Sequence, residues 1–194
     1  MRKYNEKMTK LSSNFELDRY GLHCRLVTED DAEFITVLRS DPKLGRFIHA
    51  SDGDVQKQIE WIREYKKREE CGSDYYFMFE YLEKRIGVYR IAEINNDDSF
   101  MCGSLVFATS SYKMASAAAM VVVHEIAFEY LNLLQEIDYI GTHENNKGLL
   151  MFKKTMGFED NGERLDSLGR FITSTLKKED FYKNINSITH FLLK

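Results

Sequence analysis

Residues 138–158 read DYIGTHENNKGLLMFKKTMGF and hold more structural information than any other part of this chain. They begin with a short strand pattern, 138–143, followed by Asn146, whose side chain can accept a bond from a free backbone N–H at a helix start. A helix of about three turns should follow and end at Gly157, because glycine tolerates the left-handed conformation that closes many helices. The chain then enters another strand through Phe158. The stretch therefore predicts a strand, a capped helix and a second strand in direct succession.

Hydrophobic patterns before and after this unit predict further strands and helices. Strands are expected at 21–27, 74–82, 85–94, 100–108, 163–167 and 170–176. Helices are expected at 29–40, 54–70 and 178–193. The segment 110–133 is ambiguous, since three consecutive valines favour a strand, but its length and its alanines favour a helix. The strands between 74 and 108 are separated by short turns, which predicts an antiparallel meander.

Composition limits the number of domains and the kinds of partner. The chain has 194 residues, of which 43% are hydrophobic, and this is enough for one domain with its own core. We expect an N-terminal arm or peripheral element over residues 1–19 and a single domain over 20–194. Lys and Arg are scattered and the net charge is −4, which argues against a nucleic-acid partner.

Membrane, secretion and metal signals are absent from the sequence. The start, MRKYNEKMTK, has no apolar region, and no stretch reaches the roughly 18 apolar residues of a membrane span. We therefore expect a cytoplasmic protein without a membrane partner. Cys24, Cys71 and Cys102 form no C-x-x-C pair, which predicts free thiols and no metal site. Cys102 lies in an apolar strand pattern and is interpreted as a small core residue rather than a nucleophile.

The 138–158 stretch resembles the C-terminal signature of the GNAT superfamily of acetyl-CoA-dependent N-acetyltransferases. In that family an Asn after the fifth strand precedes a helix that ends in Gly-Phe or a similar pair, and these fall on Asn146, Gly157 and Phe158. The expected order, β-α-α-β-β-β-α-β-α-β-β, is also the GNAT order over about residues 20–177. The resemblance implies an α/β (α+β) fold whose central sheet is mixed, mostly antiparallel and flanked by helices. It also implies acetyl-CoA as cosubstrate and a small-molecule amine as acceptor.

The CoA-binding loop departs from the family pattern of Arg or Gln, two residues, Gly, one residue, and Gly or Ala. That loop aligns with residues 111–116, SYKMAS, where neither usual glycine is present. A helix N-terminus attracts anions without glycine, so pyrophosphate binding is still expected there. The cofactor residues implied by the resemblance are Ser111, Lys113, Met114, Ala115 and Ser116, with the amides of Leu105 and Val106 at the thioester carbonyl and Asn146 at the pantetheine.

Acetyl transfer also needs a base, because the acceptor amine must be neutral when it attacks. His143, at the exit of its strand, is the leading candidate, since an imidazole with a pKa near 6.5 suits that task. Glu144 is the second, although each residue could instead cap the loop or lie in solvent. The tyrosine that often protonates the departing thiolate in GNAT enzymes aligns with Lys153, which the amphipathic pattern places on the solvated helix face. The leaving-group acid is therefore unassigned.

Three functions remain open from the sequence. The segments FMCGSLVF, SSYKMASAAA and HENNKGLLMFKK resemble a GNAT subgroup of bacterial surface-polysaccharide enzymes that acetylate amino sugars carried on nucleotides. LRSDP followed by RFIHA also resembles ribosomal-protein N-terminal acetyltransferases, so a protein N-terminus or small amine is the alternative. The third is a non-catalytic binding or regulatory module, suggested by the missing glycines and tyrosine. Arg46, His49 and Arg90 are the candidate acceptor-binding residues, and a homodimer through edge strands or the last helix is open.

Overall fold

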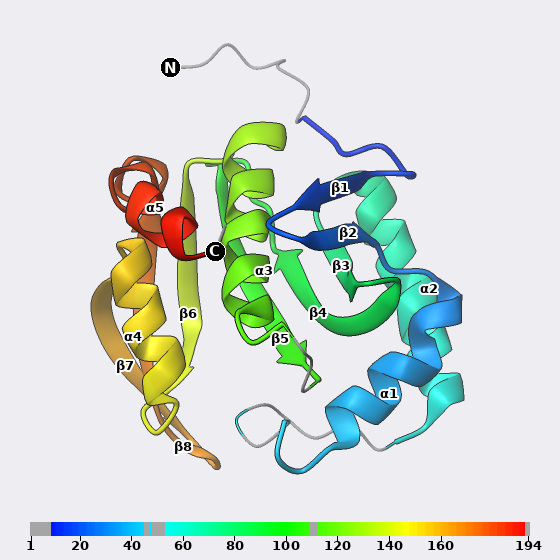
Figure 1. The fold of residues 1–194 in the computed structure, drawn as a ribbon. Helices are drawn as coiled ribbons and strands as arrows, with labels where there is room; N and C mark the ends of the chain where they lie inside the picture. Colours follow the sequence, from blue (N-terminus) through cyan, green and yellow to red (C-terminus); the bar gives the residue numbers. More distant parts are fainter. Residues whose placement is uncertain (1–8, 45–46, 48–52, 109–111, 193–194) are drawn as a thin grey trace.

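A computed structural model describes residues 9–44, 47, 53–108 and 112–192. Within these ranges the chain forms one eight-stranded sheet with helices packed on it (Figure 1). The strands are β1 (Glu16–Arg19), β2 (Leu22–Leu26), β3 (Tyr75–Tyr81), β4 (Lys84–Ala92), β5 (Ser99–Phe107), β6 (Gln135–His143), β7 (Glu159–Asp166) and β8 (Gly169–Lys177). The α-helices are α1 (Ala32–Ser40), α2 (Val55–Cys71), α3 (Ala115–Glu125), α4 (Lys147–Met156) and α5 (Lys178–Leu192). A 3-10 turn (Glu29–Asp31) precedes α1, and a π-helical turn (Ile126–Tyr130) continues α3.

The expected order of elements is confirmed, with three corrections to the strands. A strand that was not expected, β1, pairs with β2 in the region assigned to the N-terminal arm or peripheral element. Its sequence, ELDR, is mostly exposed, so it has no apolar alternation by which it could be recognised. The strand β6 begins three residues earlier than expected and β7 begins four residues earlier, at Glu159. The polar sequence of β7, an edge strand, hides its start in the same way.

Side chains of β3 alternate between two cores, one on each face of the sheet. Tyr75, Phe77 and Phe79 are fully buried in a core that contains the buried residues of α3 and α5. Tyr76 and Met78 belong to a second core with buried residues of α1 and α2. Because neighbouring residues of a strand point to opposite faces, the two helix pairs cover opposite sides of the sheet.

The strands β5 and β6 are paired only where they begin. They run parallel and match Ser99 with Gln135 and Phe100 with Glu136. The register of β5 against β4 then shifts, with Ser104 at a φ of 55°, and the register of β6 against β8 shifts around Gly141, at a φ of 84°. Such bulges bend and twist a strand, so the two strands separate and leave a V-shaped gap (Figure 1). The sheet is otherwise antiparallel, as expected.

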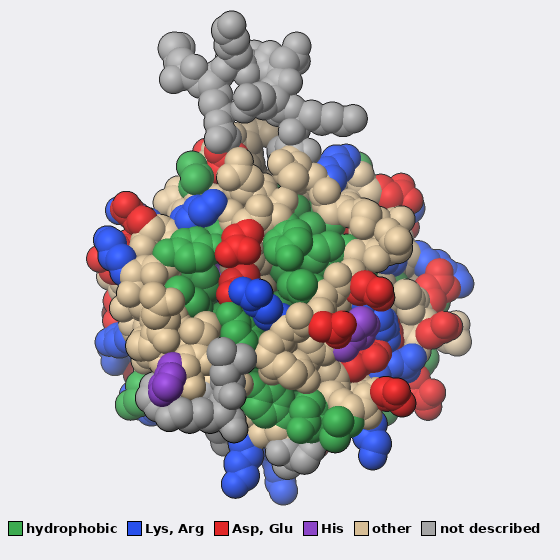
Figure 2. Space-filling model, turned by 45° about the horizontal axis from the view of Figure 1, so that its top comes forward, with side chains coloured by type: hydrophobic (Ala, Val, Ile, Leu, Met, Phe, Trp, Pro, Cys, Tyr) green, Lys and Arg blue, Asp and Glu red, His purple; other side chains and the backbone are tan. Residues whose placement is uncertain are grey.

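The surface carries charges of both signs. On the face shown in Figure 2, Lys and Arg side chains alternate with Asp and Glu side chains and do not gather into one basic area. Of the helices in the described ranges, none has the length and apolar character needed to cross a membrane.

Replacing Gly87 by alanine is expected to destabilise the sheet, because a Cβ there would lie 2.3 Å from ring carbons of Phe107. The Phe107 ring packs against Phe79 with centroids 5.6 Å apart, so moving the ring aside would disturb this contact. We expect Gly87→Ala to lower the free energy of unfolding by about 1–3 kcal/mol in urea titrations. Gly103→Ala is the matched control, since a Cβ there meets nothing within 4 Å. Equal effects of the two substitutions would contradict the steric explanation.

Candidate active site

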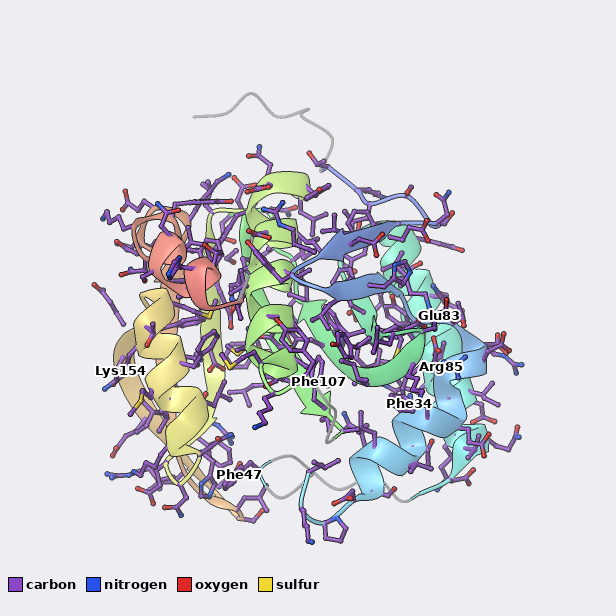
Figure 3. All side chains as sticks on the ribbon, viewed as in Figure 1. Phe34, Phe47, Glu83, Arg85, Phe107 and Lys154 are labelled. Atoms are coloured by element: carbon purple, nitrogen blue, oxygen red, sulfur yellow. The ribbon has the colours of Figure 1, made fainter. Side chains whose placement is uncertain are left out.

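A cleft of about 320 Å³ lies in the gap between β5 and β6 and is lined from both faces of the sheet. On the side of α3 and α4 its walls include Cys102, Met120, Glu136, Asp138, Asn146 and Lys153. On the side of α1 they include Arg39, Leu44, Phe47 and Arg90. The loop after α1 carries Phe47 to the lower end of the gap, where its ring lies 5.1 Å from that of His143 (Figure 3). Two substrates could therefore approach the same point from opposite sides.

The start of α3 provides the expected place for an anion. Ala115 is buried at the first helical position, while Lys113, Met114 and Ser116 are exposed around it. The N-cap residue Met114 makes no side-chain capping bond among the described residues, and the first amides of an α-helix have no acceptor within the helix. These residues are not among those that line the cleft, to which α3 contributes Met120 instead. Ser111 lies outside the described residues.

The bulge in β5 sets the orientation of the backbone next to the cleft. Leu105 lines the cleft directly after Ser104, whereas the side chain of Val106 is buried in the second core. A positive φ at Ser104 rotates the following peptide, which is how a bulge can turn an amide out of the ladder. The Oγ of Ser104 accepts a hydrogen bond from Nη1 of Arg39 at 3.3 Å, which ties α1 to the bulge.

Asn146 begins α4, and its side-chain oxygen accepts from the backbone N–H of Leu149 at 3.4 Å. The predicted cap is therefore confirmed, and Gly157 ends the helix in the left-handed conformation. Asn146 also lines the cleft, so its amide group is available for a ligand there. Its contact with pantetheine stays a prediction.

His143 lies at the mouth of the cleft with both ring nitrogens in hydrogen bonds. Its Nδ1 accepts from the backbone N–H of Asn145 at 3.1 Å, so Nε2 carries the proton and donates to the carbonyl of Leu168 at 3.0 Å. Glu144 accepts from Nε of Arg170 at 3.0 Å and is not among the residues that line the cleft. To act as a base, His143 would have to release Nδ1 and Glu144 would have to leave Arg170.

Lys153 is buried, and its placement on the solvated helix face was wrong. Its ammonium donates to a carboxylate oxygen of Asp138 at 2.5 Å and lies 4.3 Å from the ring centroid of Phe158. Burial raises the pKa of Asp138, and the charge of Lys153 opposes that rise. The periodic pattern of α4 missed this position because the partner carboxylate comes from β6. The cleft therefore has a buried ammonium at the position where the family often has a tyrosine.

A second buried pair lies next to Lys153 and Asp138. Nε2 of His124 is 2.5 Å from Glu136, and Nδ1 is 2.6 Å from the carbonyl of Met120. Burial alone would raise the pKa of Glu136, but His124 and other neighbours outweigh it and the pKa is lowered. The thiol of Cys102 lies close to both groups.

Cys102, His124 and Glu136 lie close enough to be compared with a set of metal ligands, but the distance between His124 and Glu136 fits a hydrogen bond better. Two ligands of one tetrahedral zinc ion lie about 3.4 Å apart, since each is about 2.1 Å from the metal. The distance of 2.5 Å between His124 and Glu136 fits a charge-assisted hydrogen bond instead. Burial raises the pKa of the Cys102 thiol well above its usual range, which agrees with its interpretation as a core residue.

Of the three candidate acceptor-binding residues, the structure places Arg90 in the cleft. Its Nε donates to Asp74 at 2.6 Å, and its guanidinium lies 5.2 Å from the ring centroid of Trp61. Arg46 and His49 lie outside the described residues. The sequence did not indicate that Arg39, Glu136 and Asp138 would line the cleft. The two acidic residues at alternate positions of β6, Glu136 and Asp138, were the available signal for the last two.

Comparison with known proteins identifies the family. The model of the GNAT acetyltransferase domain matches residues 22–159. No match is found among curated proteins. Among solved structures, apo FdhC, described as a nucleotide-linked sugar GNAT, is 32% identical with a TM-score of 0.80, covering 92% of this chain and 99% of that chain.

Two more distant structures share the fold. Mycobacterium smegmatis RimJ in complex with CoA-disulfide is 13% identical with a TM-score of 0.74, covering 92% of this chain and 93% of that chain. Spermidine N-acetyltransferase from Vibrio cholerae in complex with CoA and spermine is 16% identical with a TM-score of 0.71, covering 84% of this chain and 98% of that chain. The match of the family model to most of the chain, together with the separated strands β5 and β6, leads to one conclusion: this chain belongs to the GNAT acetyltransferase family.

Proposed function

We propose that this GNAT acetyltransferase transfers the acetyl group of acetyl-CoA to the amine of a nucleotide-linked amino sugar. The observation that carries this proposal is the 32% identity to a nucleotide-linked sugar GNAT over nearly the full length of both chains. The cleft supports the same reaction, because it is lined from both faces of the sheet and can bring a donor and an acceptor together.

The donor is expected on the side of α3 and α4. The separated edges of β5 and β6 offer backbone groups to which a pantetheine arm can bind like an added strand. The N-terminus of α3, with Lys113 beside it, suits the pyrophosphate. An amide after the bulge, at Leu105 or Val106, would polarise the thioester carbonyl where negative charge develops.

The acceptor amine then attacks the carbonyl carbon, a C–N bond forms and the C–S bond breaks. We assign the proton for the leaving thiolate to the ammonium of Lys153, which is held by Asp138 on the donor side of the cleft. The amine proton leaves through His143 or Glu144, directly or through water, after one of these residues exchanges its present hydrogen bond. Lys153 regains its proton from solvent, so the net products are the amide and free CoA.

Acetyl-CoA binding and acetyl transfer are separate measurements that test this function. We expect acetyl-CoA and CoA, but not ATP, to raise the melting temperature; about 2.7 kcal/mol is gained at a hundred times the dissociation constant. Release of the CoA thiol should then be followed with a nucleotide-linked amino sugar, a peptide N-terminus and spermidine as acceptors. Highest kcat/KM for the nucleotide-linked sugar would support the proposal. A preference for the peptide or for spermidine would indicate that the acceptor is a protein N-terminus or a small amine instead. If the protein neither binds acetyl-CoA nor transfers its acetyl group, a non-catalytic module is favoured.

A further inference from the structure

Four cationic side chains among the described residues line the cleft, and three of them are neutralised by a carboxylate. Arg90 pairs with Asp74, Lys153 pairs with Asp138, and Arg164 pairs with Asp166 at 2.7 Å. The fourth is Arg39, near the C-terminal end of α1.

Arg39 has hydrogen-bond partners, but they are neutral. Nη1 donates to Oγ of Ser104 at 3.3 Å, and the guanidinium interacts with the hydroxyl of Tyr76. Burial raises the pKa of Tyr76 to about 12, so this phenol stays neutral near pH 7. Within the described part of the chain, no carboxylate forms an ion pair with Arg39. A half-buried guanidinium whose charge has no opposite charge beside it favours binding of an anion.

The position of Arg39 assigns that anion to the acceptor. Arg39 comes from α1, which covers the face of the sheet opposite α3. The expected CoA pyrophosphate site at the start of α3, and the pair of Lys153 with Asp138, belong to the other face. Arg39 is also bonded to Ser104, directly before the bulge amide at Leu105. An anion at Arg39 would therefore lie close to the reacting carbonyl, on the side from which the amine arrives.

We propose that Arg39 binds the sugar-linked phosphate of the acceptor and thereby selects nucleotide-linked amino sugars over the same sugars without phosphate. This inference rests on the proposed function, because it names the group by which that acceptor is recognised. A guanidinium has five N–H donors in a planar arrangement, so donors remain for two phosphate oxygens after the bonds to Ser104 and Tyr76. The same charge disfavours a polycationic acceptor.

The test compares Arg39→Gln and Arg39→Lys with the native protein on three acceptors: a nucleotide-linked amino sugar, the amino sugar 1-phosphate and the free amino sugar. We expect Arg39→Gln to lower kcat/KM about 10- to 100-fold for the two phosphorylated acceptors, because a hydrogen bond to a charged group is lost. The free sugar should change less than about threefold, and the KM for acetyl-CoA should not change. Arg39→Lys should recover part of the loss. Arg63→Gln is the control, since Arg63 is an exposed arginine on α2 that pairs with Glu29.

A binding measurement separates failure of this inference from failure of the proposed function. Inorganic pyrophosphate is titrated into the protein saturated with CoA, so that the site at the start of α3 is already filled. Weaker binding to Arg39→Gln than to the native protein supports the anion site even when no amino sugar is acetylated. Equal pyrophosphate binding by the two proteins overturns it, even when acetyl transfer is observed. An equal loss of kcat/KM for phosphorylated and free sugars also overturns it and assigns Arg39 to support of the bulge through Ser104.

Discussion

Substitution of Lys153 by methionine is expected to lower kcat for acetyl transfer about 100- to 10,000-fold, the usual range for loss of a general acid. The reason is the position of its ammonium, which lines the cleft on the donor side and is held by Asp138 at 2.5 Å. Methionine fills a similar volume but has no proton to give to the departing thiolate. The rate should be measured by release of thiol at saturating acetyl-CoA and acceptor.

A second thioester distinguishes proton transfer from a structural role of Lys153. An acetyl ester of an aromatic thiol has a more acidic leaving group, which departs without a proton, so the loss caused by Lys153→Met should shrink with that donor. Lys154→Met is the matched control, because Lys154 is the next residue of α4 but points away from the cleft and is 63% exposed (Figure 3). It should retain activity within about twofold. An equal loss with both thioesters would show that Lys153 only supports the site.

The fold could be predicted because each main element has a local signal in the sequence. Asn146 and Gly157 bound α4 by their own backbone chemistry, and both predictions are confirmed. Alternation in β3 places aromatic residues in both cores, which also follows from local sequence. The elements that escaped prediction are polar edge strands, where exposure removes the alternating pattern: β1, and the first residues of β7.

The chemistry of the cleft could be predicted less well, because it depends on pairs of residues far apart in the chain. Lys153 was placed in solvent since a pattern along one helix contains no information about Asp138 on β6. Arg39 was missed because its contact with Ser104 spans 65 residues. His143 lines the cleft, but its two hydrogen bonds depend on the turn after β6 and on the carbonyl of Leu168, which the sequence does not indicate.

Loss of Glu136 is expected to cause the largest change in stability. The side chain of His124 is fully buried. The rings of Phe100, Phe128, Phe158 and Phe181 surround it, with their centroids 5.7–6.2 Å from that of its imidazole. In Glu136→Leu the imidazole would keep its bond to Met120 but lose the carboxylate that pairs with Nε2. Breaking a buried pair in this way costs about 3–5 kcal/mol. Urea unfolding at pH 7 measures the loss.

The double substitution His124→Leu with Glu136→Leu shows whether that loss comes from the stranded partner. Replacing both members of a buried pair by apolar residues is often neutral or stabilising, so the double variant should recover most of the stability lost in Glu136→Leu. If the double variant is as unstable as Glu136→Leu, the loss comes from packing near Glu136 rather than from an unpaired imidazole.

The pair also predicts a dependence on pH. The pKa of Glu136 is lower in the folded protein than its ordinary value near 4.3, so ionisation of this carboxyl stabilises the fold at neutral pH. That contribution is present above about pH 4.3 and is lost as the pH falls through the lowered pKa of the folded state. The difference in unfolding free energy between the native protein and Glu136→Gln should therefore shrink as the pH falls below about 4. A difference that stays constant from pH 7 down to pH 3 would contradict a lowered pKa of Glu136 in the folded protein.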